Sequence, residues 1–135
     1  MKSTLAPGLS FTRHIAVDKP RTIGFMGDEL RVYSTPSMVQ DVEYTCKELL
    51  DQHLDAGESS VGARVEIDHL GATLLGQQVE VKTTITGVEG RRVMFDVEVH
   101  DGLDKVGASK HTRFVVTLEK QAERLAAKRA RLKSA

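Results

Sequence analysis

The stretch Thr35–Gly57 reads TPSMVQDVEYTCKELLDQHLDAG and predicts the longest helix of the chain. Thr35 is a natural N-cap, Pro36 suits the first helical position, and Gly57 stands just past the expected end. Apolar residues recur at steps of three and four and form one stripe: Val39, Val42, Cys46, Leu49, Leu50 and Leu54. Such a helix needs a second layer against which it can bury this stripe.

Glu43 interrupts the apolar stripe. On a helical wheel it lies only about 40° from Val39, where a core would place an aliphatic side chain. Burying an unpaired carboxylate costs several kcal/mol, so such a site must supply partners or shift the protonation of the group. Both suit an acid, a base or a nucleophile. In the alternative interpretation, Glu43 lies at the edge of the stripe and reaches solvent, and the wheel does not decide between the two.

Five strand-like segments accompany the helix. Phe11–Val17 precedes it and is followed by a Gly-containing loop, and behind the helix come Ser60–His69, Gln77–Thr86, Arg91–His100 and Lys105–Leu118. The third and fourth segments alternate between apolar and polar residues, which is typical of an antiparallel sheet with one buried face. The helix is the only long amphipathic element that could cover this face. The sequence therefore predicts an α+β fold in which a curled antiparallel β-sheet wraps around one long central helix.

Length and composition fit a single domain over residues 1–135, with 40% hydrophobic and 28% charged residues. Lys plus Arg and Asp plus Glu number 19 each, which gives no reason to expect nucleic acid or a membrane as a partner. Residues 119–135 predict a basic helical tail. The single Cys46 has no disulfide or metal-binding partner, and no apolar run has the length of a signal peptide or a membrane span, so we expect a cytoplasmic protein.

A second polar residue, His69, lies in phase with the apolar positions of its strand. Strict alternation places it on one face with Val61, Ala63, Val65 and Ile67, and places Gly62, Arg64, Glu66 and Asp68 on the other. The face with His69 is expected to pack on the side of the helix that carries Glu43. Two titratable groups that converge on an apolar surface indicate an active site better than either group alone. In the alternative interpretation, His69 is a core-edge residue, which is the most common role of a His at the end of a strand.

Thr35 adds a hydroxyl at a helix N-terminus, where free N–H groups and the helix dipole can stabilise an oxyanion. Capping of the helix is its ordinary role. Eight residues separate Thr35 from Glu43, which corresponds to about 12 Å along the axis. This is too far for one small carbonyl group to contact both residues. If Thr35 and Glu43 act on the same substrate, we therefore expect them to come from different subunits.

Several pieces of sequence occur together in an order and spacing that resemble a known family between about Val32 and Lys120. They are Thr35, Met38-Val39 and Glu43 on the helix, then Gly57-Glu58, Val61-Gly62, His69, Ala72-Thr73 and Gly76, then Val88-Glu89-Gly90-Arg91-Arg92, His100-Asp101-Gly102, Asp104, Gly107, His111 and Arg113. With these pieces the chain resembles the hotdog-fold thioesterases, most closely the fluoroacetyl-CoA thioesterase group.

This resemblance implies a homodimer with sites at the subunit interface that cleaves an acyl-CoA thioester, and it leaves a tetramer open. Thr35, Glu43 and His69 match the catalytic positions, Gly62 matches a backbone contact to substrate, and Arg113 matches an Arg close to the substrate. Glu43 would attack the thioester or activate water, and His69 would serve as acid or base. No metal and no cofactor are expected beyond the CoA that the substrate carries.

Two departures concern the acyl group. The stretch Met26–Ser34 lacks a Phe where the fluoroacetyl enzyme has a Phe-containing lid, and Pro36-Ser37 replaces a Gly-Phe pair. The aromatic gate is therefore expected to be missing, and the resemblance carries over the reaction class but not the acyl group. Two other functions stay open. One is an acyl-thioester dehydratase or hydratase, and the other is a non-catalytic acyl-CoA-binding module, which a Glu43 locked in a salt bridge would favour.

Overall fold

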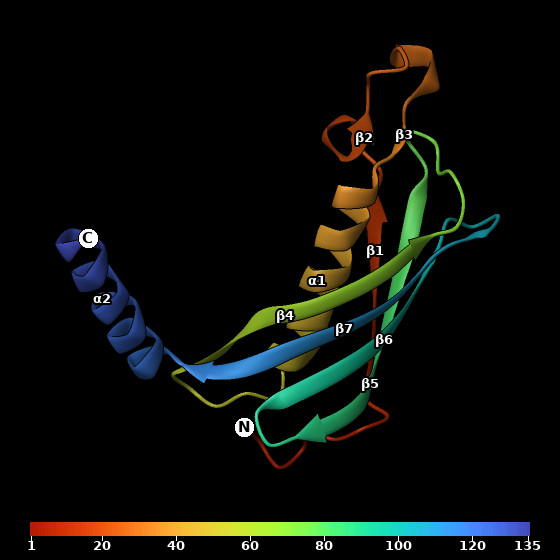
Figure 1. The fold of residues 1–135 in the computed structure, drawn as a ribbon. Coiled ribbons are helices and arrows are strands. Elements are labelled where there is room, and N and C mark those ends of the chain that lie inside the picture. Colours follow the sequence, from red (N-terminus) through yellow and green to blue (C-terminus); the bar gives the residue numbers. More distant parts are fainter.

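A computed structural model describes residues 1–135 and has an α+β fold (Figure 1). Five strands form the main sheet: β1 (Ser10–Ala16), β4 (Glu58–His69), β5 (Gln78–Glu89), β6 (Arg92–His100) and β7 (Lys105–Thr117). The helices are α1 (Thr35–Asp51) and α2 (Leu118–Ser134). Two short strands, β2 (Thr22–Ile23) and β3 (Val32–Tyr33), pair as a hairpin ahead of α1.

The sheet has the order β1-β5-β6-β7-β4, and all neighbouring strands are antiparallel. It curls around α1, which crosses one of its faces (Figure 1). The predicted curled sheet around a central helix is thereby confirmed. Since β1 and β4 are the edge strands, β4 pairs with β7 on one side only.

The core lies between α1 and the inward face of the sheet. The alternation expected in the third and fourth strand segments is confirmed, because one face of each strand is buried. The buried apolar residues of these three elements are Met38, Val42, Cys46, Leu49 and Leu50 of α1, Val79, Val81 and Ile85 of β5, and Val93, Phe95, Val97 and Val99 of β6.

The start of α1 differs from the expectation that Thr35 is the N-cap. Ser34 is the cap, and its Oγ accepts a hydrogen bond from the Ser37 N–H at 3.2 Å. The helix also ends at Asp51, well before Gly57, which has a φ of +80° in the turn that leads into β4. Because Ser34 supplies the capping oxygen, the hydroxyl of Thr35 is free for another partner.

Strand β4 contains a bulge that the sequence pattern did not reveal. Its register with β7 shifts between Gly62, which lies opposite Arg113, and Arg64, which lies opposite Thr112. The extra residue inverts the alternation of side chains along the strand. Gly62 therefore faces α1, as His69 does on the other side of the bulge, and its predicted place on the opposite face is wrong.

The segments at either end of this core are less regular. The predicted loop before α1 contains the β2–β3 hairpin and two short 3₁₀ turns, Lys19–Arg21 and Asp28–Leu30. Helix α2 holds the basic tail, buries none of its side chains and projects away from the sheet (Figure 1). Neither helix combines the length and the apolar character that a membrane crossing requires.

Candidate active site

Thr35 and His69 meet where the start of α1 approaches the end of β4. Thr35 Oγ1 and His69 Nδ1 form a hydrogen bond of 2.8 Å. Burial lowers the pKa of His69, against an opposing contribution from the Gly71 backbone. A neutral imidazole has one acceptor nitrogen, and we assign it to Nδ1, so that the Thr35 hydroxyl donates. The pair can therefore move a proton between a hydroxyl and a base.

Glu43 lies two turns further along α1, beside the bulge of β4. It is half-buried and faces Gly62. A Cβ atom added to Gly62 would lie 3.4 Å from Glu43 Oε1, 3.4 Å from Arg113 Nη1 and 3.3 Å from His111 Cε1. The absence of a side chain at Gly62 thus leaves the strand backbone open between these three polar groups.

Arg113 is buried and held in a fixed orientation. Its Nε donates to Ser60 Oγ at 2.8 Å, its Nη2 donates to the Ser60 carbonyl at 3.1 Å, and its Nη1 lies 3.2 Å from His111 Nε2. Burial lowers the pKa of Arg113, and the negative charge of Glu43 opposes this shift. Arg113 therefore places a positive charge behind Glu43.

His111 has a structural place in this cluster that sequence reasoning did not give it. Its Nδ1 lies 2.7 Å from the carbonyl of Arg64 at the bulge, and its Nε2 faces Arg113. Arginine only donates, so Nε2 accepts, and Nδ1 carries the proton and donates to Arg64. Burial lowers the pKa of His111, which agrees with a neutral ring. Its phase with buried Val115 along β7 was the signal that could have singled it out.

Glu43 takes no part in any hydrogen bond or ion pair within the chain. It influences Arg113 and His111 through its charge alone. The locked salt bridge that would have favoured a non-catalytic binding module is therefore not formed within one chain. A half-buried carboxylate with free oxygens remains available for a substrate or water.

The five predicted site residues form two groups. Thr35 and His69 make one group, and Glu43, Gly62 and Arg113 make the other. Along β4, Gly62 and His69 are roughly 20 Å apart at about 3.3 Å per residue. Within one chain, Glu43 and His69 therefore do not converge on a single point, contrary to the expectation from the packing of their faces.

An apolar pocket of about 430 Å³ opens beside Thr35 and His69. Its apolar lining includes Ile23, Phe25, Val32, Leu70 and Ala72. Phe25 immediately precedes the stretch in which the aromatic gate was expected to be missing, and its side chain is 83% exposed. An aromatic residue thus does stand at this pocket, but it lies outside the stretch Met26–Ser34, so the absence of the family's gate stays a prediction.

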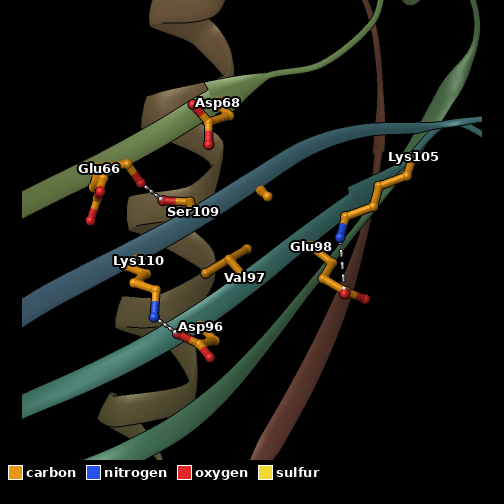
Figure 2. Close-up of a pocket in the computed structure, with 9 residues that line it drawn as sticks. Glu66, Asp68, Asp96, Val97, Glu98, Lys105, Ser109 and Lys110 are labelled. Carbon is orange, nitrogen blue, oxygen red and sulfur yellow. Dashed lines mark hydrogen bonds and ion pairs between the residues drawn. The ribbon is translucent and has the colours of Figure 1, made fainter.

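A second groove, of about 240 Å³, lies on the opposite face of the sheet (Figure 2). Charged residues line it, and Lys105 and Lys110 pair there with Glu98 and Asp96 at 3.2 and 3.8 Å. Figure 2 shows α1 behind the sheet, on the far side from this groove. None of the predicted site residues lines it.

Other reactive side chains add no further centre. Nowhere do three side chains of the His, Cys, Asp and Glu types gather as metal ligands. Burial raises the pKa of the Cys46 thiol to about 12, and its Sγ lies 3.2 Å from Thr83 Oγ1 inside the core. Cys46 is therefore a core residue and not a nucleophile.

Comparisons with known proteins identify the family of the chain. The profile of the family described as "Fluoroacetyl-CoA-specific thioesterase" matches residues 17–119. A fluoroacetyl-CoA thioesterase of Streptantibioticus cattleyicolor is 33% identical over 127 residues, which cover 89% of this chain and 91% of that protein.

Solved structures give the same result. A fluoroacetyl-CoA thioesterase structure superposes with a TM-score of 0.83 at 31% identity, covering 93% of this chain and 98% of that one. A hot-dog-like protein from Thermanaerovibrio acidaminovorans gives 0.83 at 26% identity, covering 90% and 91%. The chain is therefore a hotdog-fold thioester hydrolase that belongs to the fluoroacetyl-CoA-specific thioesterase family.

Proposed function

We propose that the protein is an acyl-CoA thioesterase that hydrolyses a thioester to a carboxylate and free CoA, with Thr35, Glu43 and His69 as its catalytic residues. One observation carries the proposal: a Thr35–His69 proton-transfer pair stands at one end of the α1–β4 contact, and an unpaired carboxylate stands at the other. A mutant of the related fluoroacetyl-CoA thioesterase, 32% identical to this chain, was solved with fluoroacetate and CoA.

We further propose that two chains pair through β4. The strand is a free edge, and its Val61 and Val65 side chains are 40% and 37% exposed. A long exposed edge is a template for another strand, since its backbone N–H and C=O groups on that side lack partners in the sheet. A homodimer with two-fold symmetry would satisfy both edges at once.

This pairing would complete the site. An antiparallel pair of β4 strands with its axis near Val65 would place the Gly62 end of one strand beside the His69 end of the other. The two strands would carry α1 and its symmetry mate on the same face of a continuous sheet. Each Glu43 would then face a Thr35–His69 pair across the interface, and the dimer would hold two equivalent sites.

The chemistry at such a site follows from the roles of these groups. The N-terminus of α1 would polarise the thioester carbonyl, while the Thr35 hydroxyl, which donates to His69, holds the imidazole beside it. Glu43 either attacks the carbonyl carbon or removes a proton from the water that does so. When the tetrahedral intermediate collapses, the C–S bond breaks and CoA leaves as a thiolate. The proton that water gives up, to Glu43 as general base or to His69 when water attacks the acyl-Glu43 anhydride, then passes to this thiolate. Water supplies the new carboxylate oxygen, directly or by hydrolysis of the acyl-Glu43 anhydride.

The apolar pocket beside the Thr35–His69 pair is the proposed acyl site. Its walls come from the β2–β3 hairpin and from the loop after β4, so the acyl preference would depend on these two segments. Ile23 and Phe25 would contact an acyl chain while its carbonyl lies toward Thr35. Arg113, beside Gly62, would lie near the substrate but would not supply the nucleophile.

The test is the release of free thiol from a panel of short, branched, aromatic and long acyl-CoAs, including fluoroacetyl-CoA, with Glu43→Gln alongside. We expect the native protein to release thiol from at least one class and the variant to lose this activity while keeping its melting behaviour. CoA binding without thiol release across the panel would contradict the proposal and indicate a binding module.

A further inference from the structure

A buried polar cluster outside the predicted site joins Arg21, Tyr33 and Asp41. The Tyr33 hydroxyl donates to Asp41 Oδ2 at 2.5 Å. Arg21 donates from Nε and Nη2 to both carboxylate oxygens of Asp41 at 3.0 to 3.3 Å. Tyr33 is 1% exposed and Asp41 is 3% exposed. Arg21 has a 29% exposed side chain and also pairs with Asp18 at 2.9 Å, so it closes the cluster on the solvent side and shields Tyr33 and Asp41 from water.

The cluster connects three parts of the structure. Asp41 belongs to α1, Tyr33 to β3, and Arg21 to the turn before β2. The backbone reinforces these links, because Ser34 N–H donates to the Arg21 carbonyl and Tyr33 N–H donates to the Thr73 carbonyl, each at 2.9 Å. The hairpin that walls the apolar pocket is thus attached to α1 and to the loop that follows β4.

Tyr33 also touches the proposed catalytic base. Its ring meets the His69 imidazole edge-on, with ring centroids 6.2 Å apart and an interplanar angle of 71°. The opposite end of the Tyr33 side chain is the hydroxyl held by Asp41. Burial and the Asp41 carboxylate both raise the pKa of Tyr33, so its hydroxyl remains a donor. The ring is therefore fixed at one end and packed against His69 at the other.

A buried charged pair is weak evidence for stability, because the desolvation of both ions offsets their attraction. Its geometry, however, is strongly restrained, since any displacement leaves a buried charge without its partner. This cluster restrains the single aromatic ring that packs on His69. The Nδ1 of His69 in turn accepts the hydrogen bond from the Thr35 hydroxyl.

We propose that Arg21, Asp41 and Tyr33 are positioning residues for His69, which hold the Tyr33 ring in place and thereby fix the imidazole on Thr35. Their effect on turnover rests on the proposed thioesterase function, whereas the orientation of the ring does not. A loose ring would let His69 leave the Thr35 hydroxyl, and small displacements of catalytic groups are costly to rate.

The test compares Tyr33→Phe and Asp41→Asn with a matched control, Arg13→Gln. The control removes an exposed ion pair of 3.5 Å between Arg13 and Glu48, which also ends on α1 but lies away from the site. For each protein we would record the imidazole ¹⁵N shifts of His69, kcat and KM, with circular dichroism to confirm the fold. Tyr33→Phe removes a single oxygen, so it is the variant most certain to fold.

We expect both cluster variants to change the ¹⁵N shifts of His69 and to lower kcat roughly tenfold or more with little change in KM, while the control changes neither. Unchanged His69 shifts in the folded cluster variants, or an equal loss of kcat in the Arg13→Gln control, would overturn the proposal. If no acyl-CoA is hydrolysed by the native protein, the ¹⁵N shifts alone decide it.

Discussion

At the scale of single residues, the polar side chains of the candidate site differ in whether they have hydrogen-bond partners within the chain. Arg113 and His111 have partners for the groups that they bury, whereas Glu43 has none within the chain. The helical wheel left open whether Glu43 lies within the apolar stripe or at its edge, and it could not show whether a partner was present. That depends on contacts between α1, β4 and β7, which no local pattern encodes.

The buried neutral state of His111 predicts a stability that depends on pH. Its pKa is lowered in the folded protein, while the unfolded chain has an ordinary value of about 6.5. Above the unfolded value both states are neutral and the contribution to stability is complete. As the pH falls from there toward the folded value, only the unfolded state gains a proton, so the free energy of unfolding decreases.

Urea unfolding of the native protein and of His111→Gln between pH 8 and 5 measures this effect. We expect the native protein to lose stability below about pH 6.5 and the variant to lose less over the same interval. If the free energy of unfolding changes with pH in parallel for the two proteins, His111 does not contribute to the pH dependence of stability.

At the scale of elements, the sequence was sufficient to predict which face of a strand is buried where the pattern is repeated over the whole strand. The alternation in β5 and β6 predicted their buried faces correctly, because several residues in each point to the same answer. It was insufficient at single positions. The bulge in β4 adds one residue and inverts the face of Gly62, and only the register with β7 reveals it.

The choice of N-cap is a similar case. Ser34 and Thr35 are adjacent and chemically equivalent as caps, so the sequence alone does not rank them. The path of the preceding hairpin decides which residue is the cap. It is fixed by backbone hydrogen bonds from Tyr33 N–H to the Thr73 carbonyl and from Ser34 N–H to the Arg21 carbonyl. As a result, Ser34 caps the helix and Thr35 reaches His69.

Helix α2 is the element that we expect to be dispensable for folding. It buries no side chain, and its first residue is attached by a hydrogen bond of 2.8 Å from Leu118 N–H to the Gly57 carbonyl. A chain that stops after Thr117 should therefore change the free energy of unfolding by less than about 1 kcal/mol. Denaturant unfolding of the truncated and full chains gives this value, and a loss of several kcal/mol would mean that α2 packs against the folded body or a second copy.

At the scale of the whole molecule, the candidate site residues of one chain form two separate groups. The general form of the fold could be read from the sequence, while the family resemblance supplied the candidate site residues, which stay a prediction. Their division into Thr35 with His69 and Glu43 with Gly62 could not be read from the sequence, because it follows from where α1 and β4 cross. The expectation that Thr35 and Glu43 act from different subunits gains a physical basis in that separation and in the free edge of β4.

The most direct measurement is complementation between two inactive variants, His69→Gln and Glu43→Gln. In a mixed dimer with shared sites, one site would carry both substitutions and the other would carry neither. Refolding the two variants together in equal amounts should give about half mixed dimers, each with one intact site, and so restore about a quarter of the native thiol release. Mixed dimers that form and remain inactive would contradict a site shared between subunits.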